Sequence, residues 1–484
     1  MTPRSPDRPY RRVRLGPSDV VVDRRPDGSL LVRSPHALGA YPERMTEPFD
    51  HWARHASYRT FLAQREPKFG WRNVTYAEAQ FFARRIGQAL LNRGLSVERP
   101  VIILSENEIE HALLGIGCMY AGVPYVPLST AYSLESDDFE ELRYIFGLLT
   151  PGMVYVSDGG KYEKAIRAAL PSSAELVANV NPVAGATNFG DLVNTEPNES
   201  LDLAYSCIHA DTVFKILFTP DSTGKPKGVI NTHRMWASNQ EMIRACLQFL
   251  ADEPPVIVDW LPWSGAFGGN ADFGLGIYNG GTLYIDRGKP AVQHFEETIH
   301  TLRMIAPTIY ANVPDGFEIL VRHLRDDASL RKRFLSRLKL LCCVGADLSP
   351  AIRDELDEIA IQECGERVLL LTGFGSTETA PYALIGTMES GEPGLVGVPA
   401  PGVELKLVPN ASGKLEARLR GPNTTFGYWR RLDLTRQAFD EEGFFKPGDC
   451  LRFADESDPG KGFVFDGRIE GSTTGDIDSK MKTR

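Results

Sequence analysis

The chain has 484 residues, of which 42% are hydrophobic and 24% are charged, a balance that is typical of a globular protein. This length exceeds what one compact core accommodates, so we expect two or three subdomains. The formal net charge of −10 argues against a general nucleic-acid binder, which carries a basic excess.

Residues 1–40 are rich in arginine and proline, show no sustained hydrophobic period and are predicted to form an N-terminal extension. Helices and strands then alternate. We expect helices at 78–92, 108–121 and 137–149, and strands at 101–104, 123–127 and 153–156. Strands that alternate with helices of this length indicate a parallel sheet covered on both faces. Thr75 and Glu78 have the spacing of a capping box at the first helix.

The alternation resumes in the second half of the chain. We expect helices at 234–250, 292–305 and 350–364, and strands at 256–260, 308–310, 338–344 and 368–371. The predicted fold class is therefore α/β with two doubly wound sheets, which make up a core at 41–390. Short alternating runs favour a small β-barrel-like subdomain at 391–469, and the polar tail at 470–484 is predicted to be disordered.

Features that would place the protein outside the cytoplasm are missing from the sequence. No apolar run approaches the roughly 20 residues that span a bilayer, so no membrane association is expected, and the basic start lacks the apolar stretch of a secretory signal. The seven cysteines are scattered and form no Cys-x-x-Cys pair, which predicts neither a disulfide framework nor a zinc site. We therefore expect a cytoplasmic protein, with a homodimer left open.

One polar segment lies between a predicted strand at 214–218 and another at 229–231. Its sequence is TPDSTGKPKG, from Thr219 to Gly228. Hydroxyls, glycines and two lysines between strands can hold a polyphosphate, because glycine lets the backbone approach and lysine neutralises charge. A Walker-type loop does not fit, since Gly224-Lys225 is followed by Pro226. A polar surface hairpin remains the alternative.

A second polar loop, Thr372-Gly-Phe-Gly-Ser-Thr-Glu378, follows the strand predicted at 368–371. Ligands in open α/β sheets bind outside the carboxyl ends of the strands. Phe374 offers a face for a base, Thr377 a hydroxyl for phosphate, and Glu378 a hard oxygen ligand for Mg²⁺. A loop without a ligand is the alternative.

Three weaker motifs follow in the second half of the chain: Val344-Gly-Ala-Asp-Leu348, Leu419-Arg-Gly-Pro422 with Phe426-Gly-Tyr-Trp429, and Gly443–Cys450 with Gly467-Arg468. The Asp449 carboxylate can accept hydrogen bonds from two vicinal hydroxyls, which makes it a candidate for holding a ribose. For the 426–429 segment, a barrel turn plugged by an aromatic ring is as good an interpretation as a direct role.

These five motifs, in this order, resemble those of the adenylate-forming enzymes, the superfamily of acyl-CoA synthetases, luciferases and peptide-synthetase adenylation domains. The resemblance covers roughly residues 45–469. It implies ATP-dependent activation of a carboxylic acid to an acyl-adenylate, with Mg²⁺ and coenzyme A as further reactants. It also implies catalytic roles for Thr219, Lys227 and Glu378, with Glu378 on the metal. The nucleotide-binding residues implied are Thr219, Ser222, Thr223, Gly224, Lys227, Gly345, Ala346, Phe374, Gly375, Thr377, Asp449 and Arg468.

Within that superfamily, feruloyl-CoA synthetases are most similar, on the segments VINTHRMW (229–236), PTIYANVPDGFE (307–318) and TGFGSTETAP (372–381). This likeness implies an aryl-propenoic acid such as ferulate. Small and aromatic residues that could flank a flat ring are Trp263, Phe267, Tyr310, Asn312, Gly373 and Pro381. Ordinary core packing is the alternative for each of them, and a fatty acid or another aryl acid is the alternative substrate.

The sequence also departs from the superfamily pattern. Pro220 and Asp221 replace the usual Ser-Gly pair, and Gly265 stands where a histidine usually borders the carboxylate. The chain stops about where the small C-terminal domain of the superfamily should begin, and with it the catalytic lysine. The rival hypothesis is therefore a catalytically impaired module that binds nucleotide or acyl groups. An esterase-like α/β hydrolase is disfavoured, because no Gly-x-Ser-x-Gly elbow occurs.

Overall fold

The computed structural model of the chain describes residues 8–66, 70–220, 224–386 and 394–469. The predicted site residues Ser222 and Thr223 lie outside these ranges, as do Asp221 and the tail after residue 469. The fold is α/β, as predicted, and within the described residues its strands form two hydrogen-bonded systems.

The first sheet has the strand order β11-β10-β6-β5-β7-β8-β9 and is parallel except for the edge strand β11. Its strands are β5 (Val101–Leu104), β6 (Tyr125–Leu128), β7 (Met153–Asp158), β8 (Glu175–Val180), β9 (Thr187–Asn188), β10 (Val213–Thr219) and β11 (Lys227–Thr232). The helices connected to it are α2 (Tyr76–Asn92), α3 (Ile109–Ala121), α4 (Ala131–Leu134), α5 (Glu140–Leu149), α6 (Glu163–Ala169), α7 (Phe189–Val193) and α8 (Glu199–Ser206).

This sheet is covered on both faces because its strands are apolar throughout. Val101 and Ile103 of β5 pack in the cluster that contains α2 and α3, whereas Ile102 and Leu104 pack in the cluster that contains α5 and α6. The predicted capping box at the start of α2 is present, with Thr75 and Glu78 bonding each other's backbone N–H groups.

The second system starts with the strand order β4-β3-β13-β12-β14-β15-β16, parallel except for the edge strand β4. Its strands are β3 (Thr60–Glu66), β4 (Gly70–Thr75), β12 (Val256–Asp259), β13 (Thr282–Ile285), β14 (Ile309–Asn312), β15 (Leu340–Cys343) and β16 (Leu369–Gly375). The surrounding helical segments are α1 (Thr46–His55), α9 (His233–Cys246), η1 (Gln248–Ala251), the π-helical turn η2 (Phe267–Asp272), α10 (Phe273–Asn279), α11 (Phe295–Met304), α12 (Pro314–Asp326), α13 (Ala328–Leu335), α14 (Pro350–Cys364) and η3 (Thr377–Thr379).

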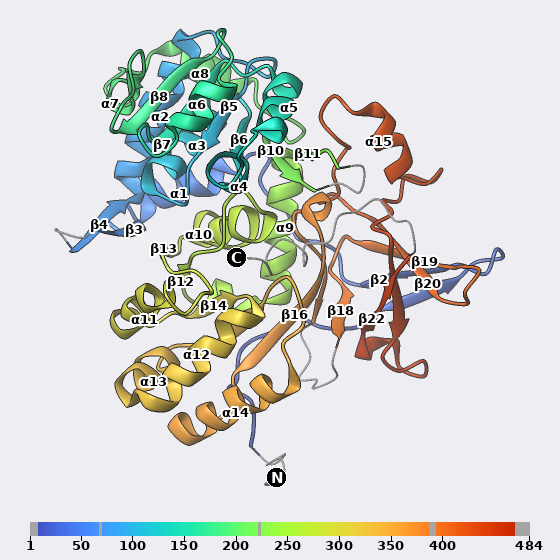
Figure 1. Cartoon of the computed structure of the whole chain (residues 1–484). Coiled ribbons are helices and arrows are strands. Elements are labelled where there is room, and N and C mark those ends of the chain that lie inside the picture. Colours follow the sequence, from blue (N-terminus) through green and yellow to red (C-terminus); the bar gives the residue numbers. More distant parts are fainter. Residues whose placement is uncertain (1–7, 67–69, 221–223, 387–393, 470–484) are drawn as a thin grey trace.

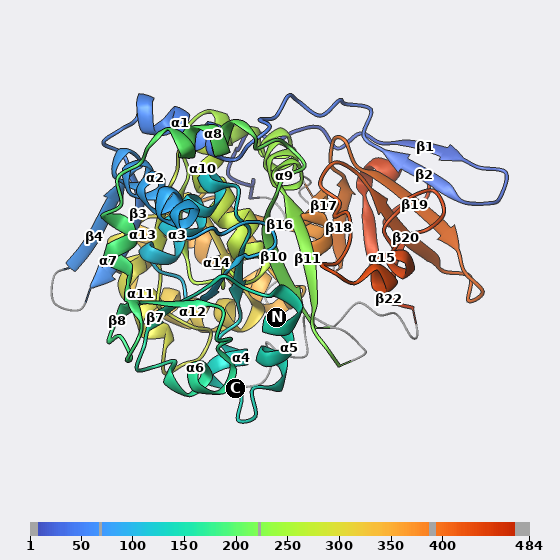
Figure 2. The same ribbon diagram turned by 90° about the horizontal axis from the view of Figure 1, so that it is seen from above.

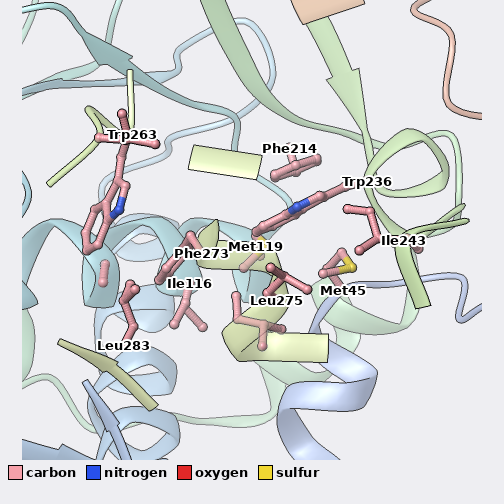
Figure 3. Close-up of a cluster of buried hydrophobic side chains, with 14 of the residues drawn as sticks. Met45, Ile116, Met119, Phe214, Trp236, Ile243, Trp263, Phe273, Leu275 and Leu283 are labelled. Atoms are coloured by element: carbon pink, nitrogen blue, oxygen red, sulfur yellow. The ribbon is translucent and has the colours of Figure 1, made fainter. Parts of the chain in front are cut away.

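The two sheets share one central core. Helices α1, α2, α3, α9 and α10 pack in the same cluster as the facing sides of both sheets, while α11–α14 cover the outer face of the second sheet. Figure 1 shows this stack, with the first sheet at the upper left and α11–α14 at the lower left. The rings of Phe214 on β10 and Trp236 on α9 stack in this core, 4.9 Å apart (Figure 3).

The strands after residue 380 continue the second sheet rather than starting a separate one. Antiparallel strands follow β16 in the order β17-β18-β22-β21-β20-β19-β2-β1. They are β17 (Tyr382–Gly386), β18 (Leu395–Pro399), β19 (Glu404–Pro409), β20 (Leu415–Arg420), β21 (Asp449–Phe453) and β22 (Phe463–Arg468), with α15 (Leu432–Ala438) and η4 (Pro459–Lys461) between them. The β-rich character of this part agrees with its sequence pattern, whereas the domain border at residue 391 stays a prediction.

The predicted N-terminal extension at 1–40 contains two strands that sequence reasoning did not identify, within the described part of that range. Strands β1 (Val21–Arg24) and β2 (Leu30–Arg33) pair with each other, and β2 also pairs with β19. Both views show them beside β19 and β20 (Figures 1 and 2). Before them, the Arg11 side chain donates to the carbonyl of Leu335, and the N–H of Gly16 donates to the carbonyl of Cys246. Both strands lie in the arginine- and proline-rich range that shows no sustained hydrophobic period, which is why sequence reasoning missed them.

None of the helices in the described ranges combines the length and the apolar composition needed to cross a membrane.

Candidate active site

The segment predicted to hold phosphate connects two paired strands. Thr219, the last residue of β10, lies opposite Lys227, the first residue of β11. Gly224 has φ of +85°, a conformation that favours glycine. The Thr219 hydroxyl is shielded from solvent and has no hydrogen-bond partner among the described residues. A shielded hydroxyl of this kind fits a site that takes an acceptor from a bound ligand.

The second predicted loop meets this hairpin through a buried group of three side chains. The Lys227 Nζ lies 3.4 Å from the Glu378 Oε1, and both side chains are 4% exposed. The Tyr428 hydroxyl accepts a hydrogen bond from the Lys227 Nζ at 3.0 Å and donates one to the Glu378 Oε1 at 2.9 Å. Lys227 and Glu378 are therefore brought together as the motifs imply, with Tyr428 between them.

Tyr428 is a site residue that sequence reasoning did not include. The segment around it runs antiparallel to β11, because the N–H of Trp429 donates to the carbonyl of Gly228 and the N–H of Ile230 to the carbonyl of Gly427. The N–H of Thr425 also donates to the carbonyl of Glu378 at 2.8 Å. These bonds place the tyrosine hydroxyl between the two loops. The available signal was the Gly427-Tyr428 pair of the weaker motif.

Glu378 is held in place by its own loop. The Ser376 hydroxyl donates to the Glu378 Oε2 at 2.8 Å, and the N–H of Glu378 donates to the Ser376 Oγ at 3.2 Å. Among the described residues, no cluster of three or more His, Cys, Asp or Glu side chains is arranged to hold a metal ion. Mg²⁺ commonly binds through one or two carboxylates together with substrate phosphates. One fixed carboxylate beside the hairpin that is predicted to hold phosphate fits that mode.

The candidate adenine residues lie at the carboxyl ends of two neighbouring strands. Strands β15 and β16 are parallel partners, so Gly345 and Ala346 after β15 and Phe374 near the end of β16 lie at the same edge. Gly345 has φ of +88°, and a Cβ there would meet no atom within 4 Å. A Cβ on Gly375, in contrast, would lie 1.8 Å from the carbonyl oxygen of Pro381. Gly375 is thus required by the chain's own packing, and Thr377 beside it is buried.

The ribose candidates form a second group on β21 and β22. The Arg468 Nε donates to the Asp449 Oδ1 at 2.9 Å, and the two residues are register partners. The Asp449 side chain is 12% exposed and the Arg468 side chain 33%. The ion pair fixes the carboxylate, and the ribose role stays a prediction.

The residues predicted to flank a flat ring divide between the two faces of the second sheet. Phe267 packs edge-to-face against Tyr382, with ring centroids 5.6 Å apart, and a Cβ on Gly373 would lie 2.8 Å from the Tyr382 ring. Pro381 directly precedes Tyr382. We call Phe267, Gly373, Pro381 and Tyr382 the aromatic wall. Tyr382 is the member that the motifs did not indicate.

Trp263, Tyr310 and Asn312 are packed differently. Trp263 is buried, 4.9 Å from Phe273 between ring centroids (Figure 3), and its Nε1 has no partner among the described residues. Tyr310 is fully buried below α12 and α13 against Phe317 and Phe334. The Asn312 amide donates to the Tyr310 hydroxyl at 2.8 Å. For Tyr310 and Asn312 these contacts favour the core-packing alternative, because the side chains lie on the sheet face opposite the aromatic wall.

Comparison with known proteins identifies a family and relatives that match most of the chain. Residues 49–429 match the family described as AMP-binding enzyme. A long-chain-fatty-acid–CoA ligase of Homo sapiens is 24% identical over 79% of this chain and 59% of its own length. The 4-hydroxybenzoate–CoA/benzoate–CoA ligase of Rhodopseudomonas palustris is 26% identical over 76% of this chain and 66% of its own. The chain thus spans about three fifths of the length of the first of these relatives.

Solved structures share the fold. An anthranilate–CoA ligase in complex with anthranoyl-AMP superposes with a TM-score of 0.74 at 20% identity, covering 89% of this chain and 79% of that one. At this identity the likeness establishes the α/β architecture alone, and the substrate has to be inferred from the site residues.

Proposed function

The chain belongs to the AMP-binding enzyme family, and we propose that it activates a carboxylic acid with ATP, forming an acyl-adenylate and then a coenzyme A thioester. The observation that carries this proposal is the buried Lys227–Tyr428–Glu378 group, which joins the phosphate hairpin to the loop at 372–378. The partnerless Thr219 hydroxyl at the same hairpin adds to it.

In the proposed reaction, a carboxylate oxygen of the acid attacks the α-phosphorus of ATP, and the bond from that phosphorus to the bridging oxygen of pyrophosphate breaks. The thiol of coenzyme A then attacks the acyl carbon, and AMP leaves. In this proposal Lys227 offsets the growing negative charge, and Glu378 would hold Mg²⁺, which supplies positive charge to the phosphates when bound. No side chain needs to form a covalent bond, so positioning and charge supply the rate.

For the acid, we propose an aryl acid, with a hydroxycinnamate such as ferulate as the first candidate. The aromatic wall supports a flat ring, because aromatic rings pack in offset or edge-to-face contacts. A fatty acid is the competing substrate, since the relatives include ligases for both kinds of acid. The cytoplasm is the proposed compartment, and all seven cysteines are free thiols, as a reducing environment requires.

The experiment is ATP–pyrophosphate exchange with the purified chain, using ferulate, 4-hydroxybenzoate, benzoate and octanoate in parallel. We expect exchange with at least one aryl acid at a rate above that with octanoate. Thioester formation with coenzyme A is then measured separately for the acid that is most active. ATP binding without exchange for any acid would contradict the proposal.

A binding module without catalysis is the second candidate, and one observation favours it. Gly265 stands where the adenylate-forming superfamily usually has a histidine, and it is exposed. A Cβ at this position would be 3.4 Å from its nearest neighbour, the Pro262 carbonyl oxygen. The position has room for a side chain that the sequence does not supply. Gly265→His raising the exchange rate would show that the missing side chain limits catalysis.

The ribose assignment makes its own prediction. A hydrogen bond to a charged acceptor contributes about 1.5–3 kcal/mol, so Asp449→Ala is expected to weaken AMP binding roughly ten- to a hundredfold. Titration calorimetry measures the affinity, and thermal unfolding checks that the fold survives loss of the Arg468 pair. Asp466→Ala is the control. Asp466 lies on β22 with Arg468 and pairs with Lys414, so its removal breaks an ion pair but should leave AMP affinity unchanged. Equal effects of the two variants would count against the assignment.

A further inference from the structure

Two buried carboxyl groups, one at the carboxyl end of β12 and one at the end of η2, have unused hydrogen-bonding capacity. Asp259 ends β12 and is 1% exposed, and Asp272 ends η2 and is 5% exposed. The Asp259 Oδ1 accepts from the N–H of Leu261 at 2.8 Å, which holds this carboxyl group at the strand end. The Oδ2 of Asp259 and the Oδ2 of Asp272 are both shielded from solvent and have no hydrogen-bond partner among the described residues.

The two carboxyl groups influence each other. Burial, together with the charge of Asp272, raises the pKa of Asp259 well above its usual range, and burial raises the pKa of Asp272 to about 7. Asp286 follows the neighbouring strand β13, but its carboxylate already accepts from the hydroxyls of Thr298 and Thr301. Asp259 and Asp272, in contrast, each keep one carboxyl oxygen that accepts no hydrogen bond from the described residues.

Helix α9 adds two more buried acceptors beside this pair. The Gln240 amide nitrogen donates to the carbonyls of Asn270 and Ala271 in η2, and the Asn239 amide nitrogen donates to the carbonyl of Tyr382. The side-chain oxygens of both residues are shielded and have no partner within the described ranges. The Asn270 Oδ1 in η2 is likewise shielded and without a partner, so five partnerless acceptors come from α9, β12 and η2. Burying acceptors without donors is costly, so a donor supplied by a ligand would be strongly favoured.

The pair is connected to the proposed acid site through one short element. The turn η2 begins with Phe267 of the aromatic wall and ends with Asp272. Burial raises the pKa of Tyr382, the other ring of the wall, and of Cys342 on β15, and the charge of Asp272 adds to both shifts. Asp272 is therefore linked to both rings of the wall, to Phe267 through η2 and to Tyr382 through its charge.

Building on the proposed acid activation, we propose that Asp259 and Asp272 form the far end of the acid site and accept a hydrogen bond from a hydroxyl or amino group on the substrate. The enzyme then selects aryl acids that carry such a donor at the end opposite the carboxylate. A site whose buried acceptors bond a donor on the substrate discriminates strongly against an analogue without that donor, because the acceptors of the site then stay unpaired. A proton shared between the two carboxyl groups, with no ligand involved, is the competing explanation.

The test compares matched acids that differ in one group: 4-hydroxycinnamate, 4-aminocinnamate and cinnamate, and the corresponding benzoates. In ATP–pyrophosphate exchange, we expect kcat/KM for the donor-bearing acid to exceed that for the unsubstituted acid by at least about tenfold. Asp272→Leu should reduce this ratio to about one, chiefly by slowing the donor-bearing acid. Asp286→Asn is the control and should keep the ratio, because that carboxylate is already bonded by threonines.

The outcomes separate this inference from the proposed acid activation. Exchange with equal kcat/KM for both acids of every pair, in the parent and in Asp272→Leu, would overturn this inference and leave the proposed activity standing. If no acid supports exchange, calorimetric binding of the same pairs replaces it as the readout, and equal affinities or no binding of either acid would overturn the inference. If Asp272→Leu fails to fold, Asp259→Asn with the same acids takes its place.

Discussion

Glu378→Gln is expected to lower the rate of ATP–pyrophosphate exchange by about a hundredfold or more, because removal of one electrostatic stabiliser from an active site commonly costs 10²–10³ in rate. Glutamine keeps the size of the side chain and can still accept from Tyr428, but it loses the charge that would hold Mg²⁺. The Mg²⁺ dependence of exchange, measured at fixed ATP, should shift to higher concentrations. Affinity for the acid alone should stay unchanged.

A control is needed because the substitution also removes a buried charge next to Lys227. Glu110→Gln is matched to it: Glu110 is 7% exposed and forms an ion pair with Arg72 on β4, outside the proposed site. This variant should retain exchange. If Glu378→Gln bound Mg·ATP and exchanged pyrophosphate like the parent, Glu378 would have a structural role and the metal assignment would be wrong.

Tyr428→Phe extends the same argument. The hydroxyl that is lost bonds both the Lys227 Nζ and the Glu378 Oε1, so the two loops lose their shared contact while the ring stays in place. We expect about a tenfold decrease in exchange, the size expected for one hydrogen bond to a charged group. An unchanged rate would mean that the lysine and the glutamate are positioned by their own strands.

Elements with local boundary signals were predicted well. Helix α14 begins and ends where the sequence indicates, because Ser349 caps its start, Pro350 occupies the first turn and Gly365 adopts φ of +76° at its end. The pairing of strands that lie far apart in the chain was not predictable from the sequence. The pairing of β2 with β19 joins segments of four and six residues that lie far apart in the chain, and neither has a periodic pattern long enough to identify its partner.

The site shows the same division. Lys227 and Glu378 belong to continuous motifs and were predicted as site residues. Tyr428 lies in a weaker motif that left its role open, and contacts between distant segments bring it and Tyr382 to the candidate site. Tyr310 had the right residue type at the right strand end, but strand alternation places its ring on the face covered by α12 and α13. A pattern in one strand fixes which residues share a face, and the ligand-facing side is decided by the rest of the fold.

Lys215→Met is expected to stabilise the folded chain, even though Lys215 lies in β10 only four residues before Thr219. The lysine is fully buried, and its Nζ donates to the carbonyl of Gly269 at 2.8 Å. The rings of Trp236, Phe214 and Tyr125 surround it at 4.6, 5.4 and 5.6 Å, and within the described residues no carboxylate pairs with it. Replacing buried ionic side chains by apolar ones of similar volume is often neutral or stabilising by about 1–4 kcal/mol.

The pH dependence of the unfolding free energy tests whether the buried, titratable amino group of Lys215 is the cause of this stabilisation. Burial lowers the pKa of Lys215 well below its usual range, so over the interval between the folded and unfolded pKa values the unfolded chain binds one more proton at this side chain. The contribution of Lys215 to stability therefore falls as pH decreases, by at most about 1.4 kcal/mol per pH unit. Methionine does not titrate. The difference in unfolding free energy between Lys215→Met and the parent should widen from pH 10 to pH 6, as measured by urea denaturation.

Lys406→Met provides a control with the opposite sign. Lys406 is 5% exposed, and burial alone would lower its pKa, but the carboxylates of Asp440, 2.8 Å from its Nζ, and of Glu442 raise that pKa above its usual value. Its removal leaves a carboxylate without that partner, so this variant should be destabilised near neutral pH. If Lys215→Met instead lowered stability by the same amount at every pH, the three rings would be holding a charged ammonium through cation–π contacts. Lys215 would then carry its charge in the central core, with its Nζ bonded to the Gly269 carbonyl of η2.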